Sequence, residues 1–226
     1  ADRIGNTYVD LLSASTGNGS ANFPQDNDGV IRRAPTAIYF DGADHVYPSL
    51  VMSAVIDILG IKKDGGFDYD FENNLLNLID STDTIVRTIP IDDNGRMYVN
   101  YFGKFQTFYY LPYSYCMDPE MLPPDYWEGK VALVGASLPG LMDLRNTPVQ
   151  ETFAGVEIHA NVMHSILQND FVVVKDNVST FYSILILCIV IGILISFPKK
   201  PFYALPLPIL GIVGWIIYAN LQFINQ

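Results

Sequence analysis

The sequence predicts an α/β domain, in which helices flank a mixed β-sheet, followed by a two-helix transmembrane hairpin. Residues 1–176 combine two amphipathic helical stretches with several short β-branched runs, which is the pattern of helices packed on a sheet. Beyond them the only charged residues are Lys199 and Lys200. The apolar runs that flank these lysines, Phe181–Phe197 and Phe202–Phe223, have 17 and 22 residues, and about 20 are needed to cross a bilayer.

The first half of the domain contains signals for a strand and a helix. Tyr8–Leu12 fits either a strand or a short helix. Ile31–Phe40 alternates in polarity as a strand does, and Pro35 favours a sheet edge or a strand start. Pro48–Gly60 carries apolar residues on one helical face, with a proline suited to the first turn and a glycine suited to the stop.

A β-hairpin and two further strands are predicted later in the domain. Thr84–Ile91 and Arg96–Phe102 flank the sequence Asp-Asp-Asn-Gly at 92–95, and Asn-Gly between two β-rich runs is the strongest short hairpin signal. Lys130–Val134 is a short apolar run between two glycines, which is typical of a buried strand. Phe171–Val174 is predicted to be the last strand of the domain.

A long loop near the end of the domain is the best candidate for a functional site. Gly135–Ala154 joins a predicted strand to a predicted helix, Gly155–Gln168, through about 20 residues, whereas such connections usually have about 2–6. Ligands of open α/β sheets bind beyond the carboxyl ends of strands, where this loop begins. The candidate ligand-binding or switch residues here are Ser137, Asp143, Arg145, Thr147, His159 and Asn161. In the alternative interpretation, Asp143 and Arg145 only hold the loop in shape through local hydrogen bonds.

A second group of candidates lies near the start of the domain. Asp26-Asn27-Asp28-Gly29 resembles the opening of a calcium loop but lacks its remaining ligands, so a turn stabilised by Asp side chains is the better interpretation. Arg32 and Arg33 follow this turn. They either pair with its acidic residues or reach into a ligand site, and both are kept as candidate ligand-binding or switch residues.

No motif predicts catalysis, a metal or a cofactor. Gly135–Gly140 fits neither the nucleophile elbow nor the phosphate-binding loop. His159 and His164 are five residues apart, so they do not share a helical face as zinc ligands at i and i+4 do. The sequence therefore names no catalytic residue, no metal ligand and no cofactor.

Charge limits the partners and orients the chain. Residues 1–176 hold 24 acidic and 11 basic residues, a formal charge of −13, which repels nucleic acid. The short basic connection at Lys199 and Lys200 predicts a cytoplasmic loop. Residues 1–176 are then outside the cytoplasm, and residues 177–226 form two helices in the lipid bilayer, at about 180–197 and 202–223, of a multi-pass inner-membrane protein. The alternative is a buried helical hairpin in a soluble protein.

Several segments, taken in order, carry a family resemblance. They are Asp26-x-Asp28-Gly29-Val30-x-Arg32-Arg33, Ile89-Pro90-x-Asp92-x-x-Gly95, Val99-Asn100-Tyr101-x-Gly103, Trp127-x-Gly129-Lys130-Val131-x-Leu133-Val134-Gly135, Asp143-x-x-x-Thr147-Pro148 and Gly155-Val156-Glu157-Ile158-His159-Ala160-Asn161. Across residues 19–170 this series resembles the CHASE2 family of bacterial extracytoplasmic sensor domains.

The resemblance implies a receptor architecture. In that family a membrane helix precedes the sensor domain, and three usually follow it before a cytoplasmic output domain. The output is an adenylate or guanylate cyclase, a histidine kinase or a serine/threonine kinase. By this comparison, we expect the chain to be an internal fragment that lacks the leading helix, the first part of the sensor domain and the output domain.

Three functions follow as hypotheses. In the first, the chain is the ligand-binding sensory module of a transmembrane receptor with a cyclase output, an unknown extracellular ligand and no enzymatic activity of its own. In the second, the chain is a membrane-anchored module that forms homodimers and takes no small molecule; the aromatic stretch Phe105–Tyr115 favours it mildly. An anchored extracytoplasmic hydrolase is third, because no nucleophile and base can be paired.

Overall fold

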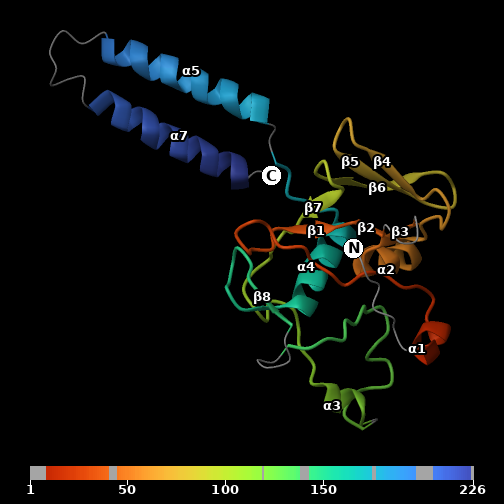
Figure 1. Cartoon of the computed structure of the whole chain (residues 1–226). Coiled ribbons are helices and arrows are strands. Elements are labelled where there is room, and N and C mark those ends of the chain that lie inside the picture. The colour runs from red at the N-terminus through yellow and green to blue at the C-terminus, as the bar shows by residue number, and fades with distance from the viewer. Residues whose placement is uncertain are drawn as a thin grey trace. The chain divides into compact units, whose positions relative to one another are not determined.

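The computed structural model describes residues 9–40, 45–118, 120–137, 143–174, 177–196 and 206–224. The chain divides into two compact units, Ala1–Val173 and Val174–Gln226 (Figure 1). The N-terminal unit contains helices and small antiparallel sheets, which confirms the predicted mixed α/β class. Each unit is described below by itself.

Short antiparallel sheets replace the single mixed sheet that the sequence predicts. The pairings among the described residues are β1 (Arg33–Pro35) with β7 (Arg96–Tyr98), β2 (Ala37–Phe40) with β3 (His45–Pro48), β4 (Phe67–Asp70) with β5 (Leu75–Ile79) and β5 with β6 (Ile85–Pro90), and β8 (Leu144–Arg145) with β9 (Phe153–Ala154). The predicted strand Ile31–Phe40 is thus two strands in different sheets, with Thr36 between them.

The predicted hairpin is wrong in its pairing, although its turn forms. Asp92 N donates to Arg96 O at 2.8 Å, and Gly95, with a φ of 70°, closes the turn. The chain then diverges, because β6 pairs with β5 whereas β7 pairs with β1. A turn sequence fixes the local reversal of the chain, but the partner of each strand depends on the packing of the whole domain.

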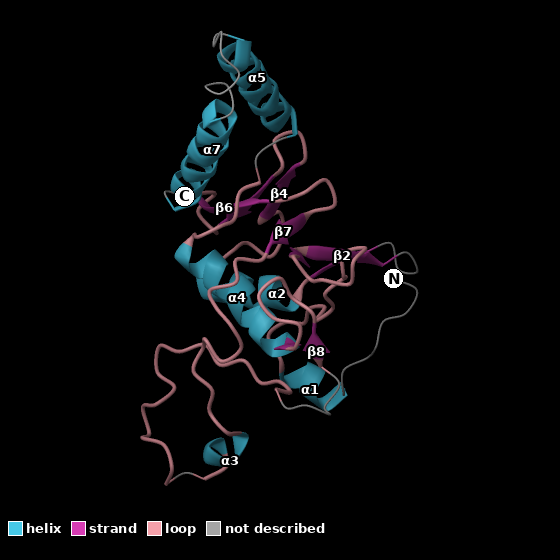
Figure 2. Ribbon diagram, turned by 90° about the vertical axis from the view of Figure 1, so that its left-hand side faces the viewer, coloured by secondary structure: helices cyan, strands magenta, loops and turns pink. Residues whose placement is uncertain are grey.

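Two helices form the centre of the N-terminal unit. Helix α2 (Leu50–Leu59) is capped by Ser49, whose Oγ accepts from Met52 N, and ends at Gly60 in the left-handed conformation. Helix α4 (Gly155–Gln168) has the predicted bounds. The two helices lie side by side in Figure 2 and share one hydrophobic core with β5, β6 and β7. Its largest fully buried apolar side chains are those of Phe153, Ile31, Met52, Leu76, Leu78, Ile89, Met97, Ile158 and Ile166.

Two segments that were predicted to be strands do not form strands in the structure. Lys130–Val134 and Phe171–Val174 have no ladder partner among the described residues. The first belongs to a long excursion, residues 109–137, which we call the arm. It carries the short helix α3 (Tyr113–Cys116) at a point far from the sheets in both views (Figures 1 and 2). Near the chain start, the segment Tyr8–Leu12, predicted as strand or helix, overlaps helix α1 (Val9–Ala14).

The C-terminal unit consists of α5 (Asn177–Ser196) and α7 (Pro206–Ile224). The helices contact each other where Gly211 of α7 approaches Ile191. Their apolar side chains are largely exposed in the described residues.

The predicted transmembrane hairpin is not supported. None of the helices in the part of the chain that the structure describes is long and apolar enough to cross a membrane. Helix α5 opens with the sequence NVSTFYS, which restricts its continuous apolar run to Ile184–Ile195. The orientation inferred from Lys199 and Lys200 falls outside the described residues.

Candidate functional site

The long loop that the sequence singled out crosses the N-terminal end of α4. A Cβ atom added to Gly155 would lie 2.5 Å from both carboxylate oxygens of Asp143, so this carboxylate lies against the first residue of the helix. Gly155 N also donates to Asp143 O at 2.9 Å. At the start of the same loop, a Cβ added to Gly135 would lie 2.6 Å from the Cβ of Val156. The carboxylate therefore lies where the partial positive charge of the helix end favours an anion.

His159 lies one turn further along the same face of α4. Residues at i and i+4 are stacked on a helix and their side chains tilt towards its N-terminus, which places the imidazole near Gly155 and the Asp143 carboxylate. The residue is 8% exposed, and its ring centroid is 4.4 Å from that of Phe23. Its Nδ1 atom has no hydrogen-bond partner among the described residues.

The environment of His159 disfavours its charged form. Burial lowers the pKa of the imidazole, and this effect outweighs the hydrogen bond with the backbone of Ala21 and the attraction of Asp143, both of which raise it. The net pKa is below the ordinary value of 6.5, so the side chain is neutral at neutral pH.

The other loop candidates are less free to meet a ligand. Thr147 is buried, and its Oγ1 donates to Gln150 O at 2.8 Å within the loop. Asn161 accepts from Phe102 N at 3.0 Å and donates to Glu157 O at 2.7 Å. Both side chains therefore hold the backbone in shape.

The remaining two candidates lie in the loop itself. Arg145 is exposed, and its Nη2 lies 3.4 Å from Asp143 Oδ1, as the structural interpretation of this pair predicts. Ser137 is half-buried, at the edge of the undescribed residues 138–142. The structure thus brings Asp143, Arg145 and His159 together and shows no contact of Ser137 with them.

Glu157 is an important residue that sequence reasoning did not select as a site residue. Its side chain is buried in the first turn of α4. The carboxylate accepts hydrogen bonds from three consecutive backbone N–H groups, those of Gln106 at 3.0 Å, Thr107 at 2.9 Å and Phe108 at 3.5 Å. It also accepts one from Tyr110 Oη at 3.0 Å. On the predicted helix Glu157 lies opposite the apolar residues, where an exposed acid is expected, so periodicity gave no signal that it is buried.

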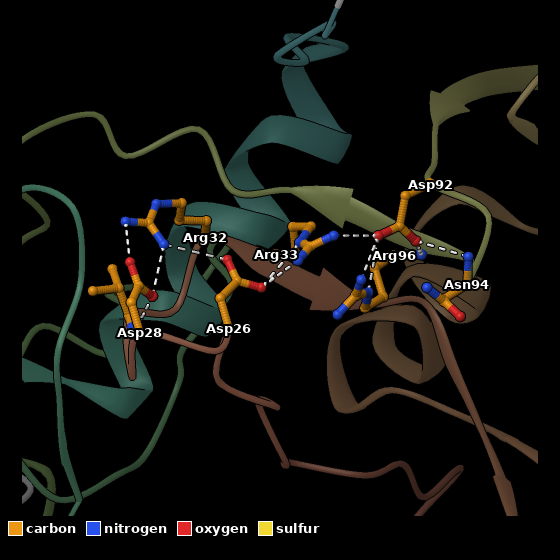
Figure 3. Close-up of polar contacts among 8 residues, drawn as sticks. Asp26, Asp28, Arg32, Arg33, Asp92, Asn94 and Arg96 are labelled. Carbon is orange, nitrogen blue, oxygen red and sulfur yellow. Dashed lines mark hydrogen bonds and ion pairs between the residues drawn. The ribbon is translucent and has the colours of Figure 1, made fainter. Parts of the chain in front are cut away.

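A second candidate site is a row of alternating charges that contains Arg32 and Arg33 (Figure 3). Asp28 and Arg32 form a bidentate pair, in which Arg32 Nη1 donates to Asp28 Oδ1 at 3.0 Å and Nη2 donates to Oδ2 at 2.8 Å. Asp26 is next in the row: its Oδ2 accepts from Arg32 Nη1 at 3.5 Å, and its Oδ1 accepts from Arg33 Nε at 3.1 Å. Both arginines therefore pair with the acidic residues of the preceding turn.

The row continues into the turn between β6 and β7. Arg33 Nη1 donates to Asp92 Oδ2 at 2.9 Å, and Arg96 Nη2 lies 2.8 Å from the same oxygen. The other carboxylate oxygen of Asp92 accepts from the backbone N–H groups of Asn94 and Arg96, each at 3.0 Å. Segments about 60 residues apart in the sequence are joined in this way, an arrangement that sequence periodicity does not predict.

The two members at one end of the row, Arg32 and Asp28, are the most exposed. Their side chains are 40% and 53% exposed, whereas those of Asp26, Arg33, Asp92 and Arg96 are between 13% and 25% exposed. A hollow of about 550 Å³ lies along the row and is lined by Gln25, Asp26, Asn27, Asp28, Arg32, Arg33 and Arg96.

The hydrogen bonds of the row keep its carboxylates ionised. The hydrogen bond from Arg32, helped by Val30 N, lowers the pKa of Asp28 to about 2. Burial alone raises the pKa of Asp92, but hydrogen bonds from Arg96 and from the Asn94 backbone outweigh it and lower the pKa overall. In the described part of the chain, no group of three or more His, Cys, Asp or Glu side chains is arranged to hold a metal ion.

Comparison with protein families matches residues 3–196 to the model of the CHASE2 domain. The chain belongs to the CHASE2 family. Comparisons with curated proteins and with solved structures give no match. CHASE2 domains are a family of extracellular sensor domains. Both candidate sites lie within the matched residues of this CHASE2 domain.

Proposed function

We propose that this chain is the signal-receiving module of a bacterial receptor and that residues 1–176 act outside the cytoplasm. The family match over residues 3–196 is the observation that carries the proposal. In the intact protein, the module passes its state to a cytoplasmic output domain, a nucleotide cyclase first and a histidine or serine/threonine kinase next. None of the described helices is able to span a membrane, and the proposal does not require that α5 and α7 do so.

The N-terminal end of α4 is the proposed switch. A signalling module needs two states whose balance the signal changes, with a typical coupling of about 1–3 kcal/mol. Asp143 has two possible partners, Arg145 in the loop and the imidazole of His159 on the helix, whose Nδ1 atom has no partner among the described residues. A change between these partners moves the long loop relative to α4.

The location is tested by adding a protease to intact spheroplasts that carry the full receptor. An extracytoplasmic module is degraded while a cytoplasmic marker survives. Protection of the module until the membrane is permeabilised contradicts the proposal. Extraction of the membrane fraction at alkaline pH shows separately whether the protein is integral.

The switch is tested in the same full receptor with Asp143→Asn and His159→Gln. Output is measured as cyclic nucleotide or phosphotransfer in cells, and both substitutions are expected to fix it at one level. Glu151→Gln removes an exposed carboxylate from the end of the same loop and serves as the matched control. Normal regulation in both variants, with normal protein levels, contradicts this assignment.

A specific observation favours homodimerisation as a second candidate function. The arm exposes large apolar and aromatic side chains of the kinds enriched in protein interfaces, namely those of Tyr109, Tyr113, Tyr115, Met117, Met121, Trp127, Val131 and Val134. By contrast, Phe105 from the same aromatic stretch packs against the core. Sedimentation equilibrium without any added small molecule tests this function. A concentration-dependent dimer that Trp127→Ser weakens supports it, and a monomer at all concentrations excludes it.

A further inference from the structure

The charged row offers its open end to solvent, and this end is loosely held. Arg32 and Asp28 are the most exposed members of the row, and exposed ion pairs contribute only about 0–1 kcal/mol to stability. The inner members, Arg33, Asp92 and Arg96, are more buried, and Asp92 binds both of these arginines and two backbone N–H groups. A ligand can therefore separate the outer pair while the inner part keeps its structure.

The hollow beside this pair has the size and the groups of a binding site. Its volume of about 550 Å³ falls within the range of small-molecule pockets, about 300–1,000 Å³. Guanidinium groups and carboxylates line it together, and the amides of Gln25 and Asn27 add neutral donors and acceptors. Both signs of charge are thus presented to one ligand.

The charge balance of the row selects among ligand classes. Three arginines face three aspartates, so the row is formally neutral (Figure 3). A ligand with only a carboxylate takes Arg32 from Asp28 and leaves that carboxylate without an arginine partner, and a ligand with only an ammonium group leaves Arg32 with only its longer contact of 3.5 Å to Asp26. A ligand with both groups satisfies both partners and leaves the balance unchanged.

We propose that this hollow binds a small zwitterion, with the ligand carboxylate on Arg32 and the ligand ammonium on Asp28. Arginine receives a carboxylate through two parallel hydrogen bonds, as Arg32 already receives Asp28. In the free protein Asp28 is ionised, because the hydrogen bond from Arg32 lowers its pKa to about 2, so the carboxylate is ready to receive an ammonium group. The site adds a ligand class to the proposed sensory role, which stands on the family match and survives if the hollow binds nothing.

Calorimetric titration of the full chain with neutral L-amino acids tests the proposal. Each amino acid is compared with the amine that lacks its carboxylate and with the acid that lacks its ammonium group; L-alanine, ethylamine and propionate form one such set. The expected result is binding of at least one amino acid about tenfold or more tighter than both relatives, a difference of ~1.4 kcal/mol. Absence of binding up to about 10 mM, or equal binding of one relative, overturns the proposal.

Two substitutions locate the site. Arg32→Gln and Asp28→Asn are each expected to weaken binding about tenfold or more. Lys62→Gln is the control, because Lys62 is also a cation paired with an aspartate, Asp83, and belongs to neither candidate site. Circular dichroism checks that each variant folds. Unchanged affinity in folded Arg32→Gln protein, or an equal loss in Lys62→Gln protein, overturns the assignment.

Discussion

Helix α4 and the strand Lys130–Val134 in the arm were both predicted from short apolar patterns, yet only the helix forms. Helix α4 has the predicted bounds and buries nine of its residues. The predicted strand has no ladder partner among the described residues; Leu133 packs against the core, but Val134 is 81% exposed. A helix closes its hydrogen bonds within itself, whereas a strand requires a neighbour. An apolar run therefore predicts a helix more securely than a strand.

The two ends of α4 add a second contrast with the arm. Glu157 receives three backbone N–H groups near the N-terminal end, and Arg87 on β6 donates to the carbonyls of Ile166 and Leu167 at the C-terminal end. In the arm, Tyr110 Oη donates to Glu157, whereas the hydrogen bonds of the described residues in segment 111–130 lie within that segment. Long-range polar contacts thus fix both ends of α4 in the domain, and in the described part of the arm such a contact lies only at its start, at Tyr110.

The largest effect is expected from Glu157→Ala. The substitution leaves three backbone N–H groups and the Tyr110 hydroxyl without their acceptor, which costs about 3 kcal/mol or more of the free energy of unfolding. Urea denaturation followed by circular dichroism measures this loss. Glu151→Ala, an exposed glutamate nearby, is the control and is expected to cost less than about 0.5 kcal/mol. Similar small losses in both variants show that packing, and not the carboxylate, holds Gln106–Phe108.

A moderate effect is expected from Arg87→Ala. The guanidinium donates to Ile166 O at 2.8 Å and to Leu167 O at 2.9 Å, where the partial negative charge of the helix end also favours a cation. Its loss is expected to lower the free energy of unfolding by about 1.5–3 kcal/mol. Arg87→Lys keeps the charge but not the forked geometry, so it recovers only part of this loss. Faster amide hydrogen exchange confined to the last turn of α4 locates the effect, and unchanged exchange there contradicts it.

Part of the fold could be predicted from the sequence because its signals are local. The bounds of α4, the cap at Gly60 and the turn at Gly95 follow from periodicity and from residues suited to left-handed backbone. Strand partners could not be predicted, since β1 pairs with β7 across about 60 residues. The apolar composition of the C-terminal unit also predicted membrane spans, which the described helices do not support.

The contacts of the candidate sites also divide into local ones and ones between segments that are distant in the sequence. A local structural role for Asp143 and Arg145 could be proposed in advance because they lie two residues apart in one loop, and the structure pairs them. The approach of Asp143 to Gly155 and the link from Arg33 to Asp92 depend on the folded chain, so sequence spacing did not reveal them. Glu157 was overlooked because a buried acid is recognised by its donors, which come from a different segment.

A smaller, pH-dependent effect is expected at His159. Its pKa is lowered in the folded state, so the unfolded chain binds the proton more tightly. The contribution to stability is complete above the unfolded value of 6.5 and is lost as pH falls from there through the folded pKa. His159→Gln is therefore expected to lose less stability than the wild type between neutral and acidic pH. Urea midpoints across this range measure the difference, His164→Gln is the control, and parallel curves for wild type and His159→Gln contradict the prediction.

The smallest effect is expected in the arm, and a matched pair of valines tests the comparison directly. Val134→Ala removes two methyl groups from a side chain that is 81% exposed, so the free energy of unfolding should change by less than about 0.5 kcal/mol. Val162→Ala removes the same groups from α4, where the side chain is 2% exposed, and is expected to cost about 2 kcal/mol. Dilute samples keep self-association out of the measurement. Since the chemical change is identical, a comparable loss for Val134→Ala can arise only if the arm is packed in the folded monomer, and the contrast between the two regions then fails.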